Sequence, residues 1–252
     1  MIEPTSDSEL WSRRSRSFGA GAADYAEHRP DYPIEAIRWG LPSGATDVVD
    51  LAAGTGKLTG NLLEMDLRVT AIEPDPGMLA ELRRRHPGVS ALDGVAEHIP
   101  LPDGQADAVL IGQAFHWFDL DRALTEIARV LKPGGRLVAL WNEDDRSVPW
   151  VAAFSDGRRS SVSRVGMSSA PDNFEHEEFG PFEERTFRHG QRRTADSLLA
   201  TIATHSHLIV IPEDERVAIL ARLGEFLAAN PETAQGEFIY PLITTALRAT
   251  RR

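Results

Sequence analysis

The feature that most constrains the fold is a short apolar run that ends in a glycine-containing turn. Residues 47–51 read Asp-Val-Val-Asp-Leu, and residues 52–56 read Ala-Ala-Gly-Thr-Gly. A short, continuous apolar run of this kind is typical of a strand that is buried on both faces of a parallel sheet. The sequence therefore predicts a buried strand that leads through a tight turn into a helix over residues 57–65.

Strand and helix signals alternate along the rest of the chain. Repeated strand-helix-strand units with short connections predict a doubly wound, mostly parallel sheet of the α/β class. Further strands are predicted at residues 68–72, 89–92, 106–112, 136–141, 182–191 and 237–248. Further helices are predicted at residues 33–40, 76–86, 121–131, 150–155, 195–206 and 213–229.

The overall charge and the lack of cysteine exclude several function classes. A net charge of -11 repels phosphate backbones and anionic lipids, so neither a nucleic acid nor a membrane is expected as a partner. Without cysteine the chain has no disulfide, no thiolate zinc site and no cysteine nucleophile, and no metal site is expected. The first residues lack the features of a signal peptide, so we expect a cytoplasmic protein.

Acidic residues mark the ends of the first two predicted strands. Asp50 lies at the end of the first strand, where it could receive an ammonium group, and Gly54 and Gly56 let a ligand approach the backbone closely. Glu73 follows the second strand at a spacing typical of nucleoside-binding proteins, and a carboxylate can accept hydrogen bonds from both hydroxyls of a ribose. These residues predict a site for a nucleoside that carries an amino-acid group. The alternative is a structural turn beside a solvated glutamate.

These two motifs resemble those of the class I S-adenosylmethionine-dependent methyltransferases. Residues 48–59 are similar to the first motif of that family and residues 72–74 to its second, with Ala52 where the family usually has its first glycine. The resemblance implies S-adenosylmethionine as cofactor and a seven-stranded, Rossmann-like methyltransferase fold with an antiparallel C-terminal strand and helical additions. In these two motifs it implies cofactor contacts by Asp50, Ala52, Gly54, Thr55, Gly56, Glu73 and Pro74.

Later segments extend the resemblance to the small-molecule methyltransferases related to trans-aconitate and quinone-precursor enzymes. Residues 93–107 are similar to the third motif, which edges the adenine ring, although Val95 stands where the family has aspartate. Residues 112–119 and 131–135 also match this subgroup. From these segments the resemblance implies cofactor contacts by Ala96, Glu97, Gln113 and Ala114.

An element before the first strand resembles the N-terminal segment that closes over the cofactor in this subgroup. It contains Tyr25 and continues through residues 29–33, Arg-Pro-Asp-Tyr-Pro. Tyr25 and Arg29 are expected to touch the methionine carboxylate or an anionic substrate, or instead to anchor the arm. The chain length favours one domain. Its expected parts within residues 1–252 are an N-terminal arm or lid at 1–40, a cofactor-binding core at 41–142, and substrate-side helices and closing strands at 143–252.

Aromatic residues after the fourth and fifth strands are candidates for the acceptor side of the site. His116 is a candidate general base for a hydroxyl or amine acceptor, because a histidine exchanges a proton near neutral pH. It could instead pack between Phe115 and Trp117. Trp117 and Trp141 are candidates for the wall of the acceptor pocket, and Trp141 could instead belong to the core.

Two other functions stay open on the sequence alone. A nicotinamide-dependent oxidoreductase would share the glycine turn and Glu73, but Thr59 occupies the last glycine position of the usual G-x-G-x-x-G pattern. A non-catalytic regulatory protein that binds S-adenosylmethionine would share the whole fold. The expected partner is a small-molecule substrate, and a homodimer stays open. The sequence does not identify the methyl acceptor.

Overall fold

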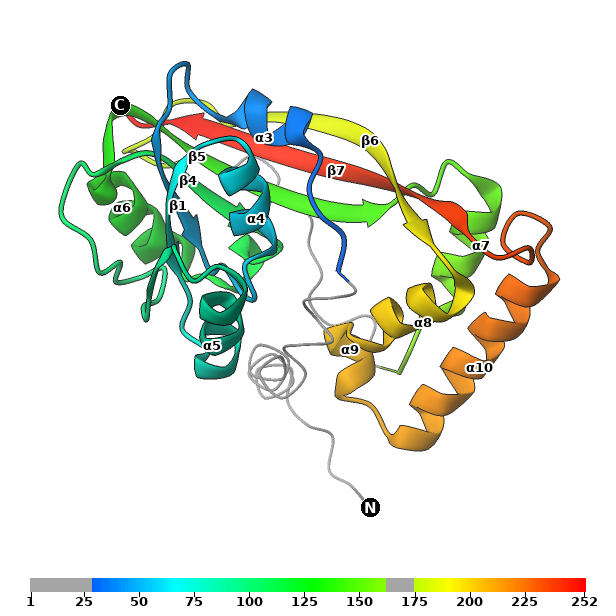
Figure 1. The fold of residues 1–252 in the computed structure, drawn as a ribbon. Coiled ribbons are helices and arrows are strands. Elements are labelled where there is room, and N and C mark those ends of the chain that lie inside the picture. The colour runs from blue at the N-terminus through cyan, green and yellow to red at the C-terminus, as the bar shows by residue number, and fades with distance from the viewer. Residues whose placement is uncertain (1–28, 162–174) are drawn as a thin grey trace. The chain divides into compact units, whose positions relative to one another are not determined.

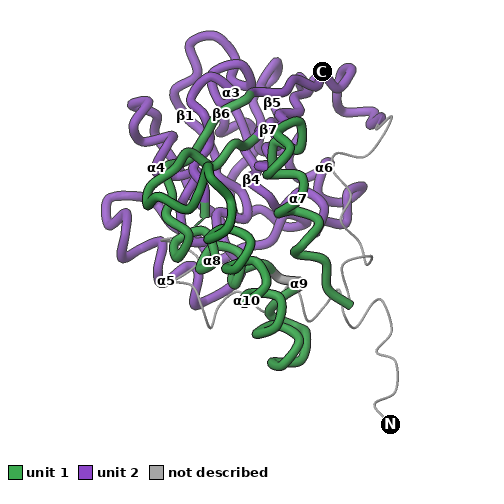
Figure 2. Tube along the Cα trace, turned by 90° about the vertical axis from the view of Figure 1, so that its right-hand side faces the viewer, with its two compact units in different colours: residues 1–29, 144–167, 188–242 green, residues 30–143, 168–187, 243–252 purple. Residues whose placement is uncertain are grey.

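The computed structural model describes residues 29–161 and 175–252 of the chain. Tyr25, a predicted cofactor contact, lies outside these residues, as does most of the predicted arm. The described residues fall into two compact units, which Figure 2 colours separately. The sheet unit contains residues 30–143, 175–187 and 243–252, and the helical unit contains Arg29 and residues 144–161 and 188–242.

Seven strands of the described chain form one mixed sheet, in the order β3-β2-β1-β4-β5-β7-β6. β1 pairs in parallel with β2 and with β4, and parallel pairing continues from β2 to β3 and from β4 to β5. The antiparallel C-terminal strand β7 lies between β5 and β6 (Figure 1). The strands are β1 (Asp47–Leu51), β2 (Arg68–Ile72), β3 (Ser90–Leu92), β4 (Ala106–Gly112), β5 (Leu131–Asp144), β6 (Glu183–Arg193) and β7 (Phe238–Thr250).

Two helices of the described chain, α5 and α8, begin at a side chain that accepts hydrogen bonds from their first backbone N–H groups. In α5, for example, Pro76 is the first residue, and the Asp75 carboxylate accepts hydrogen bonds from the N–H groups of Gly77 and Met78. The helices of the sheet unit are α3 (Ile34–Gly40), α4 (Lys57–Glu64), α5 (Pro76–Arg85), the 3-10 helix η2 (Phe115–Trp117) and α6 (Leu120–Val130). Those of the helical unit are α7 (Pro149–Gly157), α8 (Ala195–Ala203), α9 (Ser206–Ile209) and α10 (Glu213–Ala229).

Successive residues of the central strands face two different apolar layers. Val48 packs in a buried cluster with Ile37 of α3 and Leu58 of α4. The next residue, Val49, packs in the other cluster with Leu124 of α6. Side chains alternate between the two faces of a strand, and both faces are covered here, so the strands read as continuous apolar runs.

The helical unit has an aromatic core of its own. Trp150 of α7 lies edge to face against Phe238, with ring centroids 5.9 Å apart, and 5.7 Å from Tyr240. Burial raises the pKa of the Tyr240 hydroxyl well above its usual range. Among the helices of the described chain, none combines the length and apolar character needed to cross a membrane.

The register of the parallel strands brings the predicted site residues to one edge of the sheet. Asp50 lies opposite Ala71 on one side and Leu110 on the other. The carboxyl ends of β1, β2 and β4 therefore coincide, as in other open α/β sheets that bind ligands at this edge. The segments that follow these strands meet there.

The predicted fold class is confirmed, and most predicted strands and helices have the expected bounds. The main difference is β5, which begins at Leu131, whereas a turn was expected at residues 132–135. Leu131 pairs with Ala106, and the register shifts before Ala108 pairs with Arg136, so this segment joins the ladder through an irregularity. The short helices η2 and α9 were not predicted, because three or four residues carry no periodic signal.

Candidate active site

The turn after β1 adopts a backbone conformation that suits close approach by a ligand. Ala52, Gly54 and Gly56 all have positive φ angles, of 57°, 58° and 84°. A Cβ on Gly56 would lie only 2.7 Å from the ring of His86, whose Nε2 is 3.0 Å from the Gly56 carbonyl oxygen. Gly56 is therefore required both for its φ angle and for its contact with His86. It is also the N-cap residue of α4.

Asp50 is buried immediately before this turn. Its Oδ2 accepts a hydrogen bond of 2.6 Å from the hydroxyl of Thr59, and the residue is 1% exposed. Oδ1 has no hydrogen-bond partner among the described residues, and neither has the buried hydroxyl of Thr55. Burial raises the pKa of Asp50 to about 7. An ammonium group of a ligand would satisfy the unpartnered oxygen and favour the ionised carboxylate.

Glu73 joins the end of β2 to the glycine turn. Its two carboxylate oxygens accept hydrogen bonds from the N–H groups of Gly54 at 2.8 Å and Asp75 at 2.9 Å. The residue is 6% exposed, and burial, with the nearby carboxylates of Asp75 and Asp93, raises the pKa of Glu73. Each carboxylate oxygen has two lone pairs, so both retain capacity for a ligand hydroxyl. Pro74, the next residue, is exposed.

Residues 30–33 pass over the start of α4. The carboxylate of Asp31 pairs with the ammonium group of Lys57 at 3.2 Å, and the N–H of Tyr32 donates to Asn61 at 3.1 Å. The side-chain amide of Asn142, in β5, donates to the carbonyl of Asp31 at 3.2 Å. These contacts attach residues 30–33 to α4 and to β5.

Tyr32 also packs tightly against the end of β4. A Cβ placed on Gly112 would lie 2.6 Å from the Tyr32 hydroxyl oxygen, so only glycine fits at this position without displacement. The next residue, Gln113, has a positive φ of 59°. Its side-chain amide donates to the carbonyl of Asn142 at 2.9 Å, which ties the ends of β4 and β5 together.

The aromatic residues after β4 divide between the core and the partly exposed surface. Phe115 is 1% exposed and lies edge to face against Trp141, at a centroid distance of 6.1 Å. Trp141 is 4% exposed and belongs to the same buried cluster, and its indole N–H has no acceptor among the described residues. His116 and Trp117 are partly exposed, and their ring centroids lie 4.8 Å apart. Ala114, which precedes them, is partly buried.

The segment after β3 carries the other predicted cofactor residues. Ala96 is 4% exposed, whereas Val95 is 43% exposed. The carboxylate of Glu97 accepts a hydrogen bond of 2.9 Å from the N–H of Asp119, at the start of α6. In the described structure Glu97 therefore helps to attach this segment to α6.

Arg29 belongs to the other unit. Its Nη2 donates to the carbonyl of Thr204, after α8, at 3.2 Å. Both alternatives expected for Arg29, contact with the cofactor or substrate and anchoring of the arm, stay predictions. The other predicted residues, apart from Tyr25, lie in the sheet unit after β1, β2, β3, β4 and in β5.

Several residues at the site were not predicted from the sequence. Thr59 had only been considered as a misplaced residue in a glycine pattern, yet it holds Asp50. Its position in the first turn of the helix that follows the glycine turn is the signal that could have indicated this contact. The other residues that sequence reasoning missed are Lys57, Asn61, His86 and Asn142.

The fold and the site together define a class of protein. A parallel α/β sheet, a glycine turn after its first strand, a buried aspartate before that turn and a buried glutamate after the second strand are typical of enzymes that bind a nucleoside cofactor. The buried carboxylate at the amino-acid side of the turn distinguishes this site from a plain dinucleotide site.

Comparison with known proteins identifies the family. Residues 49–139 match the family model described as the methyltransferase domain. An uncharacterized methyltransferase of Mycobacterium tuberculosis (strain H37Rv) is 41% identical over 244 residues, covering 95% of this chain and 98% of the relative. The ubiquinone/menaquinone biosynthesis C-methyltransferase of Rubrivivax gelatinosus is 39% identical over 106 residues, covering 41% of this chain and 42% of its own.

A solved structure extends the similarity to the fold. It comes from Anaeromyxobacter dehalogenans, is named as a candidate type II methyltransferase, and is 26% identical to this chain. The two superpose with a TM-score of 0.68, covering 88% of this chain and 97% of the other. The chain belongs to the class I S-adenosylmethionine-dependent methyltransferase family. The comparisons favour this assignment over the oxidoreductase and the non-catalytic regulatory protein.

The residues of the site fit the cofactor that this family uses. S-adenosylmethionine carries an ammonium group, and Asp50 offers a buried carboxylate oxygen without a partner in the described structure. It also carries a ribose, and Glu73 keeps free lone pairs at the neighbouring strand end. The two carboxylates at the edge of the sheet therefore match the ammonium group and the ribose of the cofactor.

Proposed function

We propose that this chain transfers the methyl group of S-adenosylmethionine to a small-molecule acceptor and binds the cofactor along the turn after β1. The observation that carries this proposal is the buried Oδ1 of Asp50, which has no partner among the residues that the structure describes, beside a turn whose Gly54 N–H is bonded to Glu73. A buried carboxylate without a cationic partner is costly, and a ligand ammonium would remove that cost.

Each predicted cofactor residue of the sheet unit has a role in this proposal. Asp50 receives the ammonium group, and the backbone of Ala52, Gly54, Thr55 and Gly56 lines the amino-acid end. Glu73 accepts hydrogen bonds from the ribose hydroxyls, with Pro74 beside it. The buried Ala96 supplies backbone contacts at the base, with Glu97 next to it, and Gln113 and Ala114 complete the site after β4.

The chemistry needs alignment more than it needs a covalent residue. S-adenosylmethionine, when bound, supplies a methyl group on a positively charged sulfur that a nucleophile can displace in line. The task of the chain is to hold the acceptor in that line and to keep water away from it. Trp117 is partly exposed next to His116 and is the better candidate for an acceptor contact, because Trp141 is almost completely buried.

The first experiment is a binding measurement on the purified full chain. Isothermal titration calorimetry with S-adenosylhomocysteine, the demethylated product, should give saturable binding, and NAD should give none under the same conditions. No affinity for S-adenosylmethionine or its product would contradict the proposal. The acceptor can then be sought by incubating metabolite extracts with methyl-labelled cofactor and measuring the mass gain of one methyl group.

His116 is proposed as the general base if the acceptor is a hydroxyl or an amine. Replacement by asparagine should then lower turnover by about a hundredfold, with unchanged affinity for S-adenosylhomocysteine, because general base catalysis contributes at least that much. The variant should also lose the acidic limb of the pH-rate profile. Unchanged turnover across pH would leave His116 with a packing role against Trp117.

A cytoplasmic location is also a prediction, which cell fractionation measures. The sequence leaves a homodimer open, and light scattering on a sizing column measures the oligomeric state. Neither affects the assignment of the cofactor residues.

A further inference from the structure

Arg129 uses all of its side-chain N–H groups in hydrogen bonds. Its Nε and one Nη2 N–H donate to the two carboxylate oxygens of Glu126, both at 2.8 Å. The other Nη2 N–H donates to the carbonyl of Ile99 at 2.9 Å. Its Nη1 donates to the carbonyl of Leu101 and to Asp103, both at 2.8 Å. A guanidinium has five N–H donors, so this side chain is saturated.

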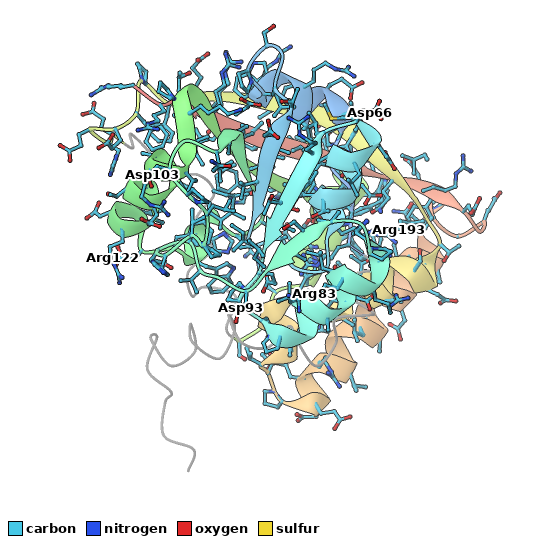
Figure 3. The ribbon with its side chains drawn as sticks, turned by 60° about the vertical axis from the view of Figure 1, so that its left-hand side comes forward. Asp66, Arg83, Asp93, Asp103, Arg122 and Arg193 are labelled. Carbon is cyan, nitrogen blue, oxygen red and sulfur yellow. The ribbon has the colours of Figure 1, made fainter. Side chains whose placement is uncertain are left out.

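These bonds attach α6 to the 93–104 loop, which connects β3 with β4. Glu126 also accepts a hydrogen bond of 2.9 Å from the N–H of Ile99, so both backbone polar groups of Ile99 are held by one Glu-Arg pair. Figure 3 labels Asp93, where the loop begins, and Asp103, near its end. Arg129 keeps the carboxylate of Glu126 ionised by holding the pKa of Glu126 below its usual range.

The start of this loop lies directly against Glu73. The N–H of Glu73 donates to the carbonyl of Leu92 at 3.1 Å. A Cβ on Gly94 would lie 2.7 Å from Pro100 and 3.1 Å from Ile72, the residue before Glu73. A ligand whose ribose binds Glu73 therefore has the backbone of this loop as its neighbour.

After Asp93, which lies near Glu73, the next three residues of the loop are Gly94, Val95 and Ala96, and none of them has a polar side chain that could bind a base. Val95 is exposed and purely apolar, and the hydrogen bond from the N–H of Asp119 to one carboxylate oxygen holds the Glu97 side chain at the start of α6. Recognition of a purine edge on this wall then depends on backbone N–H and C=O groups. Their positions are set by whatever holds the loop, and a backbone contact displaced by half an ångström loses much of its strength.

We propose that Arg129 is a positioning residue for the nucleoside end of the cofactor. It holds the 93–104 loop in a position where the backbone of the loop can form hydrogen bonds with the base beside Glu73. This inference rests on the proposed function. Arg129 lies on α6, outside the motifs at the strand ends, and thereby contributes to cofactor specificity.

The test compares Arg129→Lys with Arg122→Lys in the full chain. Arg122 is on the same helix and undergoes the same substitution, but its side chain is exposed (Figure 3). Lysine keeps the charge at position 129 but has three N–H donors on one nitrogen, so it cannot reach both Glu126 and the loop carbonyls. Two ligands are titrated into each variant: S-adenosylhomocysteine and S-inosylhomocysteine, which differ in the hydrogen-bonding edge of the purine.

The expected result is a loss of base discrimination together with a loss of affinity. Arg129→Lys should weaken S-adenosylhomocysteine binding about tenfold, the cost of one or two displaced hydrogen bonds, and should bring the two dissociation constants at least about threefold closer together. Arg122→Lys should change neither. Without ligand, backbone amides of residues 95–105 should exchange hydrogen faster in Arg129→Lys than in the wild type.

Two results would overturn the inference. One is wild-type binding by Arg129→Lys, and the other is weaker binding with an unchanged ratio of the two dissociation constants, which is what a general loss of stability produces. If Arg129→Lys does not fold, Glu126→Gln replaces it, since that variant breaks the ion pair but keeps the arginine. The ratio of the two dissociation constants then tests the inference in the same way. If the wild-type chain fails to bind S-adenosylhomocysteine, the proposed function itself is wrong.

Discussion

The carboxyl group of Asp50 links proton binding to both stability and cofactor binding. In the folded chain burial raises its pKa to about 7, whereas the ordinary value is 3.8. Because the pKa of Asp50 is higher in the folded chain than in the unfolded chain, the group stabilises the fold fully at pH values below the unfolded-state pKa. This contribution is lost as the pH rises through about 7. A ligand ammonium has the opposite preference, because it needs the ionised form.

Asp50→Asn should therefore have opposite effects on stability and on binding. At pH near 8 the variant should unfold at higher urea concentration than the wild type, and the difference should diminish toward acidic pH, because asparagine never ionises. Wild-type affinity for S-adenosylhomocysteine should fall about tenfold for each pH unit below about 7, and the variant should bind weakly without this dependence. Urea titrations and calorimetry at matched pH measure the two effects. Equal pH dependence in both proteins would show that Asp50 does not titrate in this range.

Ala52 occupies a position where glycine is more favourable. Its φ of 57° lies in the left-handed region, where a Cβ costs about 1–2 kcal/mol, partly offset by the greater chain entropy of glycine. Ala52→Gly should raise the free energy of unfolding by about 0.5–1 kcal/mol in urea denaturation. Ala53→Gly is the matched control, because Ala53 does not have a positive φ. The free energy of unfolding of this variant should fall by about the same amount. Destabilisation by both substitutions would contradict the prediction.

At the scale of the elements, the end of β4 and residues 30–33 depend on each other. A methyl group on Gly112 would lie 2.6 Å from the Tyr32 hydroxyl oxygen and 3.0 Å from its Cζ atom. Gly112→Ala should therefore displace Tyr32, destabilise the chain by about 1–3 kcal/mol and weaken S-adenosylhomocysteine binding.

A double-mutant cycle identifies the cause of that loss. Tyr32→Phe removes the atom closest to the new methyl group. The free energy of unfolding of the combined variant should therefore fall by less than the sum of the decreases in the two single variants. Gly88→Ala is the control, because a Cβ there meets no atom within 4 Å. If the two decreases in the free energy of unfolding are strictly additive, the contact between Gly112 and Tyr32 does not limit the position of residues 30–33.

At the scale of the whole molecule, three strands contain residues of both units. The boundary between the units falls at residues 143/144 in β5, 187/188 in β6 and 242/243 in β7. At these three places the chain passes from one unit to the other within a strand and not through a linker. This continuity favours the single domain expected from the chain length.

We therefore expect one cooperative unfolding transition. Differential scanning calorimetry should give equal calorimetric and van't Hoff enthalpies, and saturating S-adenosylhomocysteine should shift the whole transition upward. If the units unfold independently, two transitions will be resolved and the ligand will shift only one of them.

The sequence by itself determined the order of the elements and the two acidic residues of the site. Apolar runs, glycine turns and helix starts are local signals, so β1, β2 and β4 could be predicted to the residue, and Asp50 and Glu73 lie directly beside such signals. The expected start of β5 was wrong because its irregular pairing with β4 depends on a partner strand distant in sequence.

Only the tertiary structure decided which side chains hold those residues in place. The bond from Thr59 to Asp50, the contact of Tyr32 with Gly112 and the saturated guanidinium of Arg129 all join segments that no local pattern connects. The ionisation of Asp50 has the same origin. Its pKa is set by complete burial, and burial exists only once helices cover both faces of the sheet.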